Sequence, residues 1–392
     1  MLFSKTNNTK NNLIIDIGSS SVNFFILSLN GGKKEINSMI KTRLPLQEDP
    51  DFKHIERHAI GAIKEMAEEI QKKFPEAKPD MITVVASAPW YFCESLPVKV
   101  SRKEAFTIDK KLIDKLMSDE MELFVTKAKK NFSDAGSDIE ILDKEIMLSK
   151  VNGYPIKNPL GKISSDLEFF LYISATKKSF KDNVNDILRH HFGNIDINFV
   201  SEPLAIFRVL SQIADAQEGF VVVDVGGEVT EVYLIREGIL QDVKNFNWGG
   251  NLVVRRLASS MKLSLSEALS FFNASAEGDL KVKMDEKISP SASGVCSEWQ
   301  NFLSQSLTEL GKSNPLPQEL ILIGGTAGSA VLASCANTAN FASLTILGKP
   351  FNIMTLIPEN FGEKISLKGI DSKDKEMTLP LLLALSTSYV GI

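Results

Sequence analysis

The chain of 392 residues is longer than one hydrophobic core usually serves, so two or more domains are expected. Its residues are 43% hydrophobic, and its formal charge is only −5, with acidic and basic residues interspersed. This balance excludes a basic nucleic-acid-binding face and an acidic disordered tail, so no nucleic acid is expected as a partner. No run reaches the roughly 18 uncharged apolar residues that a membrane-spanning helix needs.

The N-terminal residues and the cysteines indicate the compartment. Residues 1–12 lack the long apolar core of a signal peptide and predict a flexible arm. Cys93, Cys296 and Cys335 are widely spaced and form no Cys-x-x-Cys or Cys/His cluster that would hold zinc. We expect them to be small buried residues in a reducing cytoplasm. The predicted location is the cytoplasm, with peripheral contact at the inner face of the cell membrane only indirect or through the N-terminal arm.

The first predicted unit is a short apolar strand at 13–15 that enters the sequence Asp16-Ile17-Gly18-Ser19-Ser20. A second strand at 22–29 returns from this loop, and the turn at 30–32 leads onward. A helix is predicted over 54–74, where apolar residues recur at helical spacing, and a buried strand over 81–86. These elements begin a βββαβ half.

Between residues 89 and 176 the pattern changes and predicts an inserted subdomain. Its expected elements are a helical stretch over 106–130, a strand over 139–151 and a strand over 166–176. The first half then resumes with a helix near 178–191 and a strand over 196–200. Glu202 and Pro203 stand where the next helix begins.

The hairpin pattern returns at Asp224-Val225-Gly226-Gly227, 208 residues after Asp16, and a strand follows Thr230. A unit repeated at that distance indicates an internal duplication of half the molecule. The region 252–310 has helical periods with a predicted loop at 289–294. A last apolar strand, 319–323, ends at Gly324-Gly325-Thr326 and leads into a predicted helix at Ala330.

The sequence therefore predicts an α/β chain of two duplicated halves, each with an inserted subdomain. The predicted divisions are an arm at 1–12, a first half at 13–88 and 177–214, its insertion at 89–176, a second half at 215–250 and 319–392, and a mainly helical insertion at 251–318.

Each hairpin is suited to binding phosphate, because glycine removes the Cβ that would block the approach of backbone N–H groups. A carboxylate at the strand end would repel phosphate, but it suits Mg²⁺, which keeps most of its waters. Asp16 and Asp224 are therefore predicted to bind Mg²⁺ through water, with MgATP as the cofactor. The predicted phosphate and nucleotide contacts are Asp16, Gly18, Ser19, Ser20, Gly226, Gly227, Thr230, Gly324, Gly325 and Thr326.

These motifs resemble, over nearly the whole chain, those of the superfamily of actin, sugar kinases and heat-shock chaperone ATPases. The loops at Asp16 and Asp224 resemble its two phosphate motifs, Glu202-Pro203 its connecting motif and Ile323–Ala327 its adenosine motif. The resemblance implies an actin-like ATPase fold of two ribonuclease H-like halves. It also implies that Glu202 and Asp224 are catalytic, with Glu202 positioning the attacking water. The alternative for Glu202 is a helix cap.

Two families within this superfamily are candidates. The place of the insertion, the segment Asn152–Gly161 and Phe246-x-x-Gly249-Gly250 resemble FtsA. This resemblance implies a cell-division scaffold that polymerises or links a tubulin-like division ring to other components. The segment Gly18–Val22 resembles the opening motif of PilM, which shares the architecture. PilM implies a cytoplasmic adaptor that binds the N-terminal peptide of an inner-membrane pilus protein. A sugar or acetate kinase is a third reading, but no substrate motif is recognisable.

The sequence departs from the superfamily pattern in the second half. Glu228 stands where a glycine is usual, and a carboxylate near a triphosphate is costly unless it turns to solvent or meets a cation. Leu269 and Phe272 replace polar residues of the nucleoside pocket, leaving Glu267 or Arg255 as other polar groups there. We predict a weak ATPase at most. The expected end of the last core helix leaves no FtsA-type amphipathic tail, so we expect another tether or no membrane role.

Overall fold

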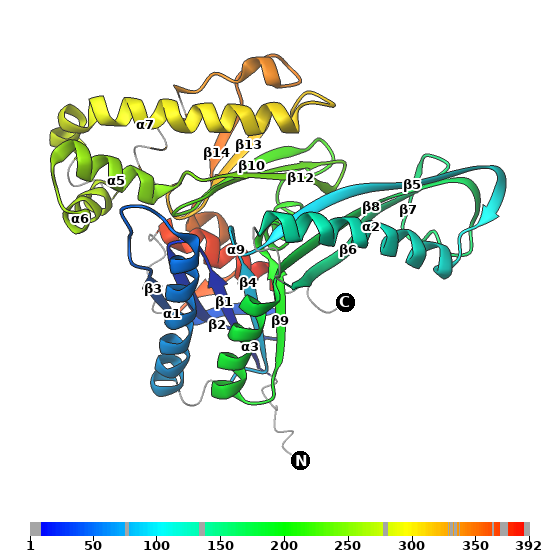
Figure 1. The fold of residues 1–392 in the computed structure, drawn as a ribbon, viewed down its shortest axis with the longest axis horizontal. Coiled ribbons are helices and arrows are strands. Elements are labelled where there is room, and N and C mark those ends of the chain that lie inside the picture. The colour runs from blue at the N-terminus through cyan, green and yellow to red at the C-terminus, as the bar shows by residue number, and fades with distance from the viewer. Residues whose placement is uncertain are drawn as a thin grey trace.

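The structure is a computed structural model. It describes residues 9–74, 78–132, 138–276, 281–327, 329, 332, 335–336, 338–362, 364–368 and 375–387. Two sheets form the body of the molecule, and a third projects from its side (Figure 1).

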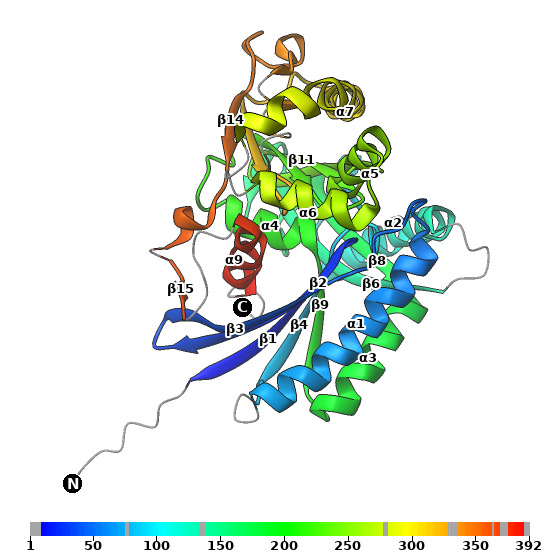
Figure 2. The same cartoon turned by 90° about the vertical axis from the view of Figure 1, so that its left-hand side faces the viewer.

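The first sheet has the strand order β15-β3-β2-β1-β4-β9. Its central strand β1 is antiparallel to β2 and parallel to β4. Two helices, α1 and α3, cover one face of this sheet (Figure 2). The elements are β1 (Lys10–Ile17), β2 (Ser21–Asn30), β3 (Lys33–Arg43), α1 (Phe52–Lys73), β4 (Met81–Ala86), α3 (Lys178–Phe192), β9 (Asp196–Ser201) and β15 (Ser366–Leu367).

The second sheet repeats this plan with the order β12-β11-β10-β13-β14. Its central strand β10 is antiparallel to β11 and parallel to β13, as β1 is to β2 and β4. Helices α5, α6 and α7 cover its outer face. The elements are β10 (Phe220–Val225), β11 (Thr230–Arg236), β12 (Ile239–Phe246), α5 (Gly250–Met261), α6 (Leu265–Ala276), α7 (Lys281–Leu310), β13 (Glu319–Ile323) and β14 (Asn352–Thr355). The predicted duplication is therefore present in the topology.

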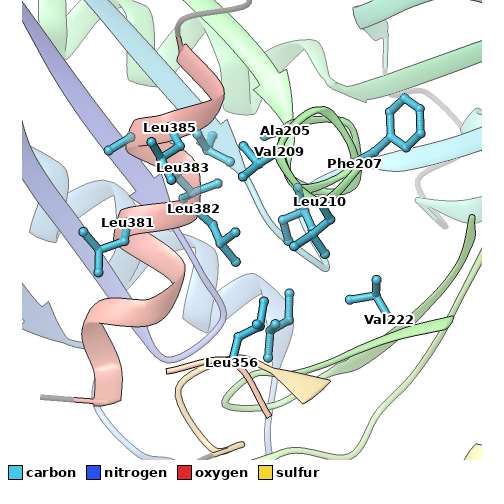
Figure 3. Close-up of a cluster of buried hydrophobic side chains, with 14 of the residues drawn as sticks. Ala205, Phe207, Val209, Leu210, Val222, Leu356, Leu381, Leu382, Leu383 and Leu385 are labelled. Carbon is cyan, nitrogen blue, oxygen red and sulfur yellow. The ribbon is translucent and has the colours of Figure 1, made fainter. Parts of the chain in front are cut away.

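Helices α4 (Glu202–Leu210) and α9 (Thr378–Ser386) lie between the two sheets and join them into one core (Figure 3). The cluster around them contains Ile14 and Phe25 from the first sheet and Val222 from the second. Each buried aliphatic or aromatic side chain contributes roughly 1.5–3 kcal/mol. The halves are therefore held by apolar packing, in addition to any ligand between them. Short 3-10 turns at Ala342–Leu344, Pro358–Phe361 and Lys375–Met377 connect the last elements.

The third sheet, of order β5-β8-β6-β7, has its own small core under α2. Its elements are β5 (Phe92–Thr107), α2 (Lys110–Asn131), β6 (Ile139–Val151), β7 (Tyr154–Ile156) and β8 (Ile163–Lys177). The helix predicted from Phe106 begins only at Lys110, because Phe106 and Thr107 pair with β8. Asp109 then caps the helix by accepting a hydrogen bond from the Leu112 amide at 2.7 Å.

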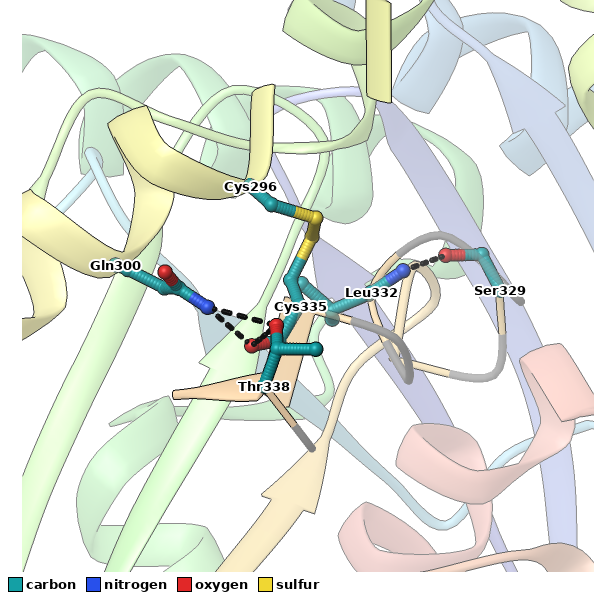
Figure 4. The surroundings of a disulfide bond; sticks show 6 residues. All are labelled: Cys296, Gln300, Ser329, Leu332, Cys335 and Thr338. Carbon is teal, nitrogen blue, oxygen red and sulfur yellow. Dashed lines mark hydrogen bonds between the residues drawn. A yellow bond between two sulfur atoms is a disulfide. The ribbon is translucent and has the colours of Figure 1, made fainter. Parts of the chain in front are cut away.

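Two other expectations are wrong. The loop predicted at 289–294 lies within the continuous helix α7. Val295 and Trp299 anchor the following turns in the core, and this packing offsets the cost of a proline in the helix. Cys296 and Cys335 form a disulfide, whereas all three cysteines were expected to be unpaired (Figure 4). Their separation of 39 residues gives no sign that α7 lies beside residues 335–336.

Two predicted segments, the N-terminal arm and the helix at Ala330, lie partly outside the described residues. Strand β1 already begins at Lys10, inside the predicted arm, and residues 1–8 lie outside the described residues. The helix predicted at Ala330 also begins outside them, although 332, 335, 336 and 338 are helical. None of the helices in the described ranges is both long and apolar enough to cross a membrane.

Truncation of a side chain in the shared core should destabilise the whole chain. Leu382 of α9 is fully buried, so Leu382→Ala should lower the free energy of unfolding by about 2–5 kcal/mol. Leu123 of α2 is 60% exposed, and Leu123→Ala should change it by less than about 0.5 kcal/mol. Chemical denaturation of both variants measures this. Equal losses would contradict the placement of α9 between the sheets.

Candidate functional site

The two predicted phosphate hairpins touch each other directly. The Glu228 amide of the second hairpin donates a hydrogen bond of 3.0 Å to the Ser19 hydroxyl of the first. A Cβ on Gly227 would lie 2.1 Å from the Cβ of Ser20, which no real pair of carbon atoms allows. Gly227 is therefore required by the contact with the opposite hairpin. The two hairpins, which were expected to bind phosphate, are thus in direct contact with each other.

The start of α5 closes the second hairpin from the other side. The carbonyl of Gly226 accepts hydrogen bonds from the Gly250 amide at 3.0 Å and the Thr326 hydroxyl at 3.1 Å. The Asn251 amide donates to the carbonyl of Gly227 at 2.9 Å. A Cβ on Gly249 would lie 2.3 Å from that carbonyl oxygen. Glycine at this position lets the helix N-terminus rest on the hairpin backbone.

Asp16 is buried at the end of β1 and is fully hydrogen-bonded. Its two oxygens accept from the Asn23 amide at 2.8 Å and the Ser87 hydroxyl at 3.2 Å. The pKa of Asp16 is raised from 3.8 to about 6, chiefly by burial; the two hydrogen bonds lower it, and the neighbouring carboxyl of Asp224 adds to the rise.

Glu202, Asp224 and Glu231 form a buried acidic cluster. Each offers one oxygen, and these oxygens all lie within 4.8 Å of one another. Burial, followed by the charge of neighbouring carboxyls, raises the pKa of Glu202 well above its ordinary value, and burial also raises that of Asp224. Glu202 Oε1 and Asp224 Oδ1 have no hydrogen-bond partner among the described residues. The cluster therefore favours protons or a cation between its oxygens.

Glu231 is the member of this cluster that sequence reasoning missed. Its carboxyl accepts hydrogen bonds from the Tyr91 hydroxyl, from the Tyr233 hydroxyl at 3.3 Å and from the Ala88 amide at 3.4 Å. Burial raises its pKa to about 8. Register was the available signal, because Glu231 lies opposite Asp224 in the second hairpin as Asn23 lies opposite Asp16 in the first.

Glu228 turns neither to solvent nor toward the acidic cluster. Its side chain is buried, and its carboxylate accepts two hydrogen bonds from the Arg255 guanidinium, at 3.0 and 2.6 Å, and one from the Asn251 amide group at 2.7 Å. This is a charge-assisted bidentate pair shielded from water. The cation that meets Glu228 is therefore the guanidinium of Arg255, whereas Mg²⁺ or a turn to solvent was considered from sequence.

The residues expected at the nucleoside pocket make contacts within the protein itself. Phe272 packs in the apolar core beneath α5 and α7. Glu267 caps its own helix by accepting a hydrogen bond from the Ser264 amide at 2.8 Å, and Arg255 is held by Glu228. With the hairpins in contact and these polar groups engaged, the residues do not fit MgATP in this arrangement. No catalytic step is therefore derived through it.

The structure brings some of the predicted site residues together and places others apart. Asp16, Glu202 and Asp224 come together at the ends of β1, β9 and β10, and the glycines and serines of both hairpins adjoin them. Thr230 instead donates its hydroxyl to the carbonyl of Trp248 at 2.7 Å. A Cβ on Gly325 would meet no atom of the described residues within 4 Å, whereas a Cβ on Gly324 would lie 2.2 Å from Asp224 Oδ1. Their roles in nucleotide binding and catalysis remain predictions.

A second candidate site is a groove of about 790 Å³ in the inserted sheet. It lies between the start of α2 and the β6–β7 end. Most of its walls are apolar, including Ile146 and Leu160, and its charged groups are Lys110, Asp114 and Lys157. Strand β7 pairs with β6 only at 149–151, so the preceding residues of β6 have no strand partner on that side in the described chain.

No protein-family model and no curated protein matches the chain. Among solved structures, the PilM–PilN type IV pilus biogenesis complex is similar over 96% of this chain and 97% of that chain, with a TM-score of 0.65 and 17% identity. A Bacteroides thetaiotaomicron protein with an actin-like ATPase fold matches over 90% and 94%, with a TM-score of 0.43 and 10% identity. The chain has an actin-like ATPase fold. The ethanolamine utilization protein EutJ from Carboxydothermus hydrogenoformans matches over 96% and 89%, with a TM-score of 0.48 and 13% identity. At these identities the likeness concerns the fold.

A methyl group at the hairpin contact should force the halves apart. Gly227→Ala places a Cβ 2.1 Å from Ser20, so we expect a loss of about 1–3 kcal/mol in the free energy of unfolding. The control is Gly61→Ala in α1, where no atom lies within 4 Å and alanine should stabilise the helix by up to about 1 kcal/mol. Denaturant titration of both variants measures the expected loss for Gly227→Ala and the expected gain for Gly61→Ala in the free energy of unfolding. A neutral Gly227→Ala would contradict the contact.

The buried carboxyl of Glu231 should make stability fall with rising pH. Its pKa is raised from 4.5 to about 8 in the folded chain, so the folded state retains a proton that the unfolded chain has released. Between these values the group lowers the free energy of unfolding by at most about 1.4 kcal/mol per pH unit. Glu231→Gln stays neutral, so its stability relative to the wild type should rise from pH 5 to pH 8. Glu237→Gln, on an exposed turn, is the control, and parallel pH profiles for all three proteins would contradict the raised pKa.

Proposed function

We propose that this chain is a cytoplasmic adaptor for an extended peptide of an inner-membrane protein, as the PilM reading implies. That reading places the peptide between the inserted subdomain and the first half, whereas we propose a site within the inserted subdomain itself. The observation that carries the proposal is the groove of about 790 Å³ beside β6 and α2. The solved PilM–PilN complex, which pairs a protein of this fold with a partner, supports the analogy.

The groove has the chemistry that an extended peptide needs. The free side of β6 offers backbone groups for an added strand, and alternate side chains of such a strand would enter the apolar walls formed by Ile113, Ile146 and Leu148. Lys110 and Lys157 provide positive charge for a carboxylate of the peptide. Leu160 is 46% exposed beside the groove, so an apolar residue of the partner would gain by covering it.

On this proposal the body of the molecule is a platform that presents the inserted sheet near the membrane. The contact between the hairpins and the pairing of Arg255 with Glu228 support a chain with little or no ATPase activity. The catalytic roles predicted for Glu202 and Asp224, and their binding of Mg²⁺ through water, are the competing interpretation of the acidic cluster.

A second candidate function is the FtsA-like division scaffold, which would self-associate and link a tubulin-like ring to other division components. The observation that favours it is an apolar surface at the outer edge of the second sheet. Ile346 and Leu347 are 66% and 61% exposed there, and Met354 of the edge strand β14 is 46% exposed. A second copy of the chain would cover these side chains in a filament.

Two peptides separate these proposals. We expect the N-terminal cytoplasmic peptide of the inner-membrane pilus-assembly protein from the same cell to bind, and the C-terminal tail of its tubulin-like division protein not to bind, in fluorescence anisotropy titrations. Leu160→Asp should weaken binding by roughly tenfold or more, whereas Leu123→Asp, on the exposed side of α2, should not. Binding of only the tubulin-like tail, together with filaments in electron micrographs, would favour the division scaffold.

A further inference from the structure

Glu228 occupies an unusual place in the duplicated hairpins. The repeat distance makes Ser20 its counterpart in the first half, so one hairpin carries a small hydroxyl where the other carries a carboxylate. The side chain of Glu228 is only 5% exposed, and that of Arg255 is 13% exposed. An ion pair removed from water in this way contributes only when both charges are well bonded, and here both guanidinium Nη atoms face the carboxylate.

The pair also joins parts of the chain that are far apart in sequence. Arg255 belongs to α5 of the second half, yet its Nη1 also donates to the carbonyl of Gln47 in the first half at 3.2 Å. The backbone of Glu228 donates to Ser19 in the first hairpin. Glu228 and Arg255 thus connect the second hairpin, α5 and the first half through one network. Loss of either charged partner would leave the other buried and unpaired.

The Glu228–Arg255 network lies where a bound phosphate would be favoured. It lies between the second hairpin and the N-terminus of a twelve-residue helix, where backbone N–H groups and the helix dipole favour a negative charge. The amides of Gly250 and Asn251 are already bonded to the hairpin carbonyls, and the Glu228 carboxylate supplies the negative charge. An incoming phosphate would have to displace both.

We propose that Glu228 is a resident anion that takes the place of a nucleotide phosphate, and that its pair with Arg255 locks the two halves closed without nucleotide. The actin-like fold of this chain is then a fixed platform. MgATP does not act as its closing ligand, and partner binding through the inserted subdomain is independent of nucleotide.

Hydrogen exchange of the full-length protein tests this, read at the amides of residues 18–21 and 226–229. We expect slow exchange in the nucleotide-free wild type and no change on adding millimolar MgATP. Arg255→Ala should accelerate exchange at these amides on the order of a hundredfold, because it leaves a buried unpaired carboxylate. The matched control is Arg256→Ala, whose guanidinium lies on the surface beside Glu298 and should leave exchange unchanged.

Two outcomes would overturn the proposal. One is fast exchange of the wild-type hairpins that becomes slow with MgATP. The other is equal exchange in Arg255→Ala and Arg256→Ala. If Arg255→Ala does not fold, Arg255→Lys keeps the charge but loses the bidentate geometry, and it should give intermediate exchange. Hydrogen exchange of the wild type with and without MgATP distinguishes halves locked by Glu228 from halves closed by nucleotide, without any variant.

Discussion

The arrangement of the molecule depends on the direct contact between its two hairpins. Ser20 rests on Gly227, and Ser19 accepts the Glu228 amide, so the ends of the two central strands are fixed against each other. A phosphate between them would need this contact to open. The acidic cluster beside this contact is buried, and its burial raises the pKa values of its carboxyls. With the hairpins in contact, the guanidinium of Arg255 donates its hydrogen bonds to the Glu228 carboxylate.

Helices α4 and α9 stabilise the closed arrangement of the two halves. They fill the space between the sheets with apolar side chains from both halves, so the hairpin contact forms on a base that is already joined. The inserted sheet has a separate core under α2 and projects from this base (Figure 1). A body with one shared core and a projecting sheet suits a protein that presents a binding groove to a partner. The apolar edge near β14 is the surface on which the scaffold alternative depends.

Much of the fold could be predicted from sequence because its signals are local. The Asp-x-Gly hairpins and the strand periodicity each depend on neighbouring residues, and the recurrence of such a local hairpin 208 residues later indicated the duplication. The site was harder, because its decisive contacts join distant segments. Glu228 meets Arg255 only after α5 packs on the hairpin, and its amide meets Ser19 of the distant first hairpin. Glu231 faces Asp224 within one hairpin, so register could have revealed it. The disulfide, the unbroken helix α7 and the start of α2 at Lys110 were missed because tertiary packing and strand pairing decided them.

The most direct test measures whether the halves are closed without nucleotide. Spin labels at Glu65 of α1 and Asn301 of α7, both exposed, report the distance between the halves by pulsed electron resonance. We predict one narrow distance distribution that is the same with and without MgATP. A broad distribution that narrows or shifts when MgATP is added would contradict the account, because nucleotide would then be the ligand that closes the halves.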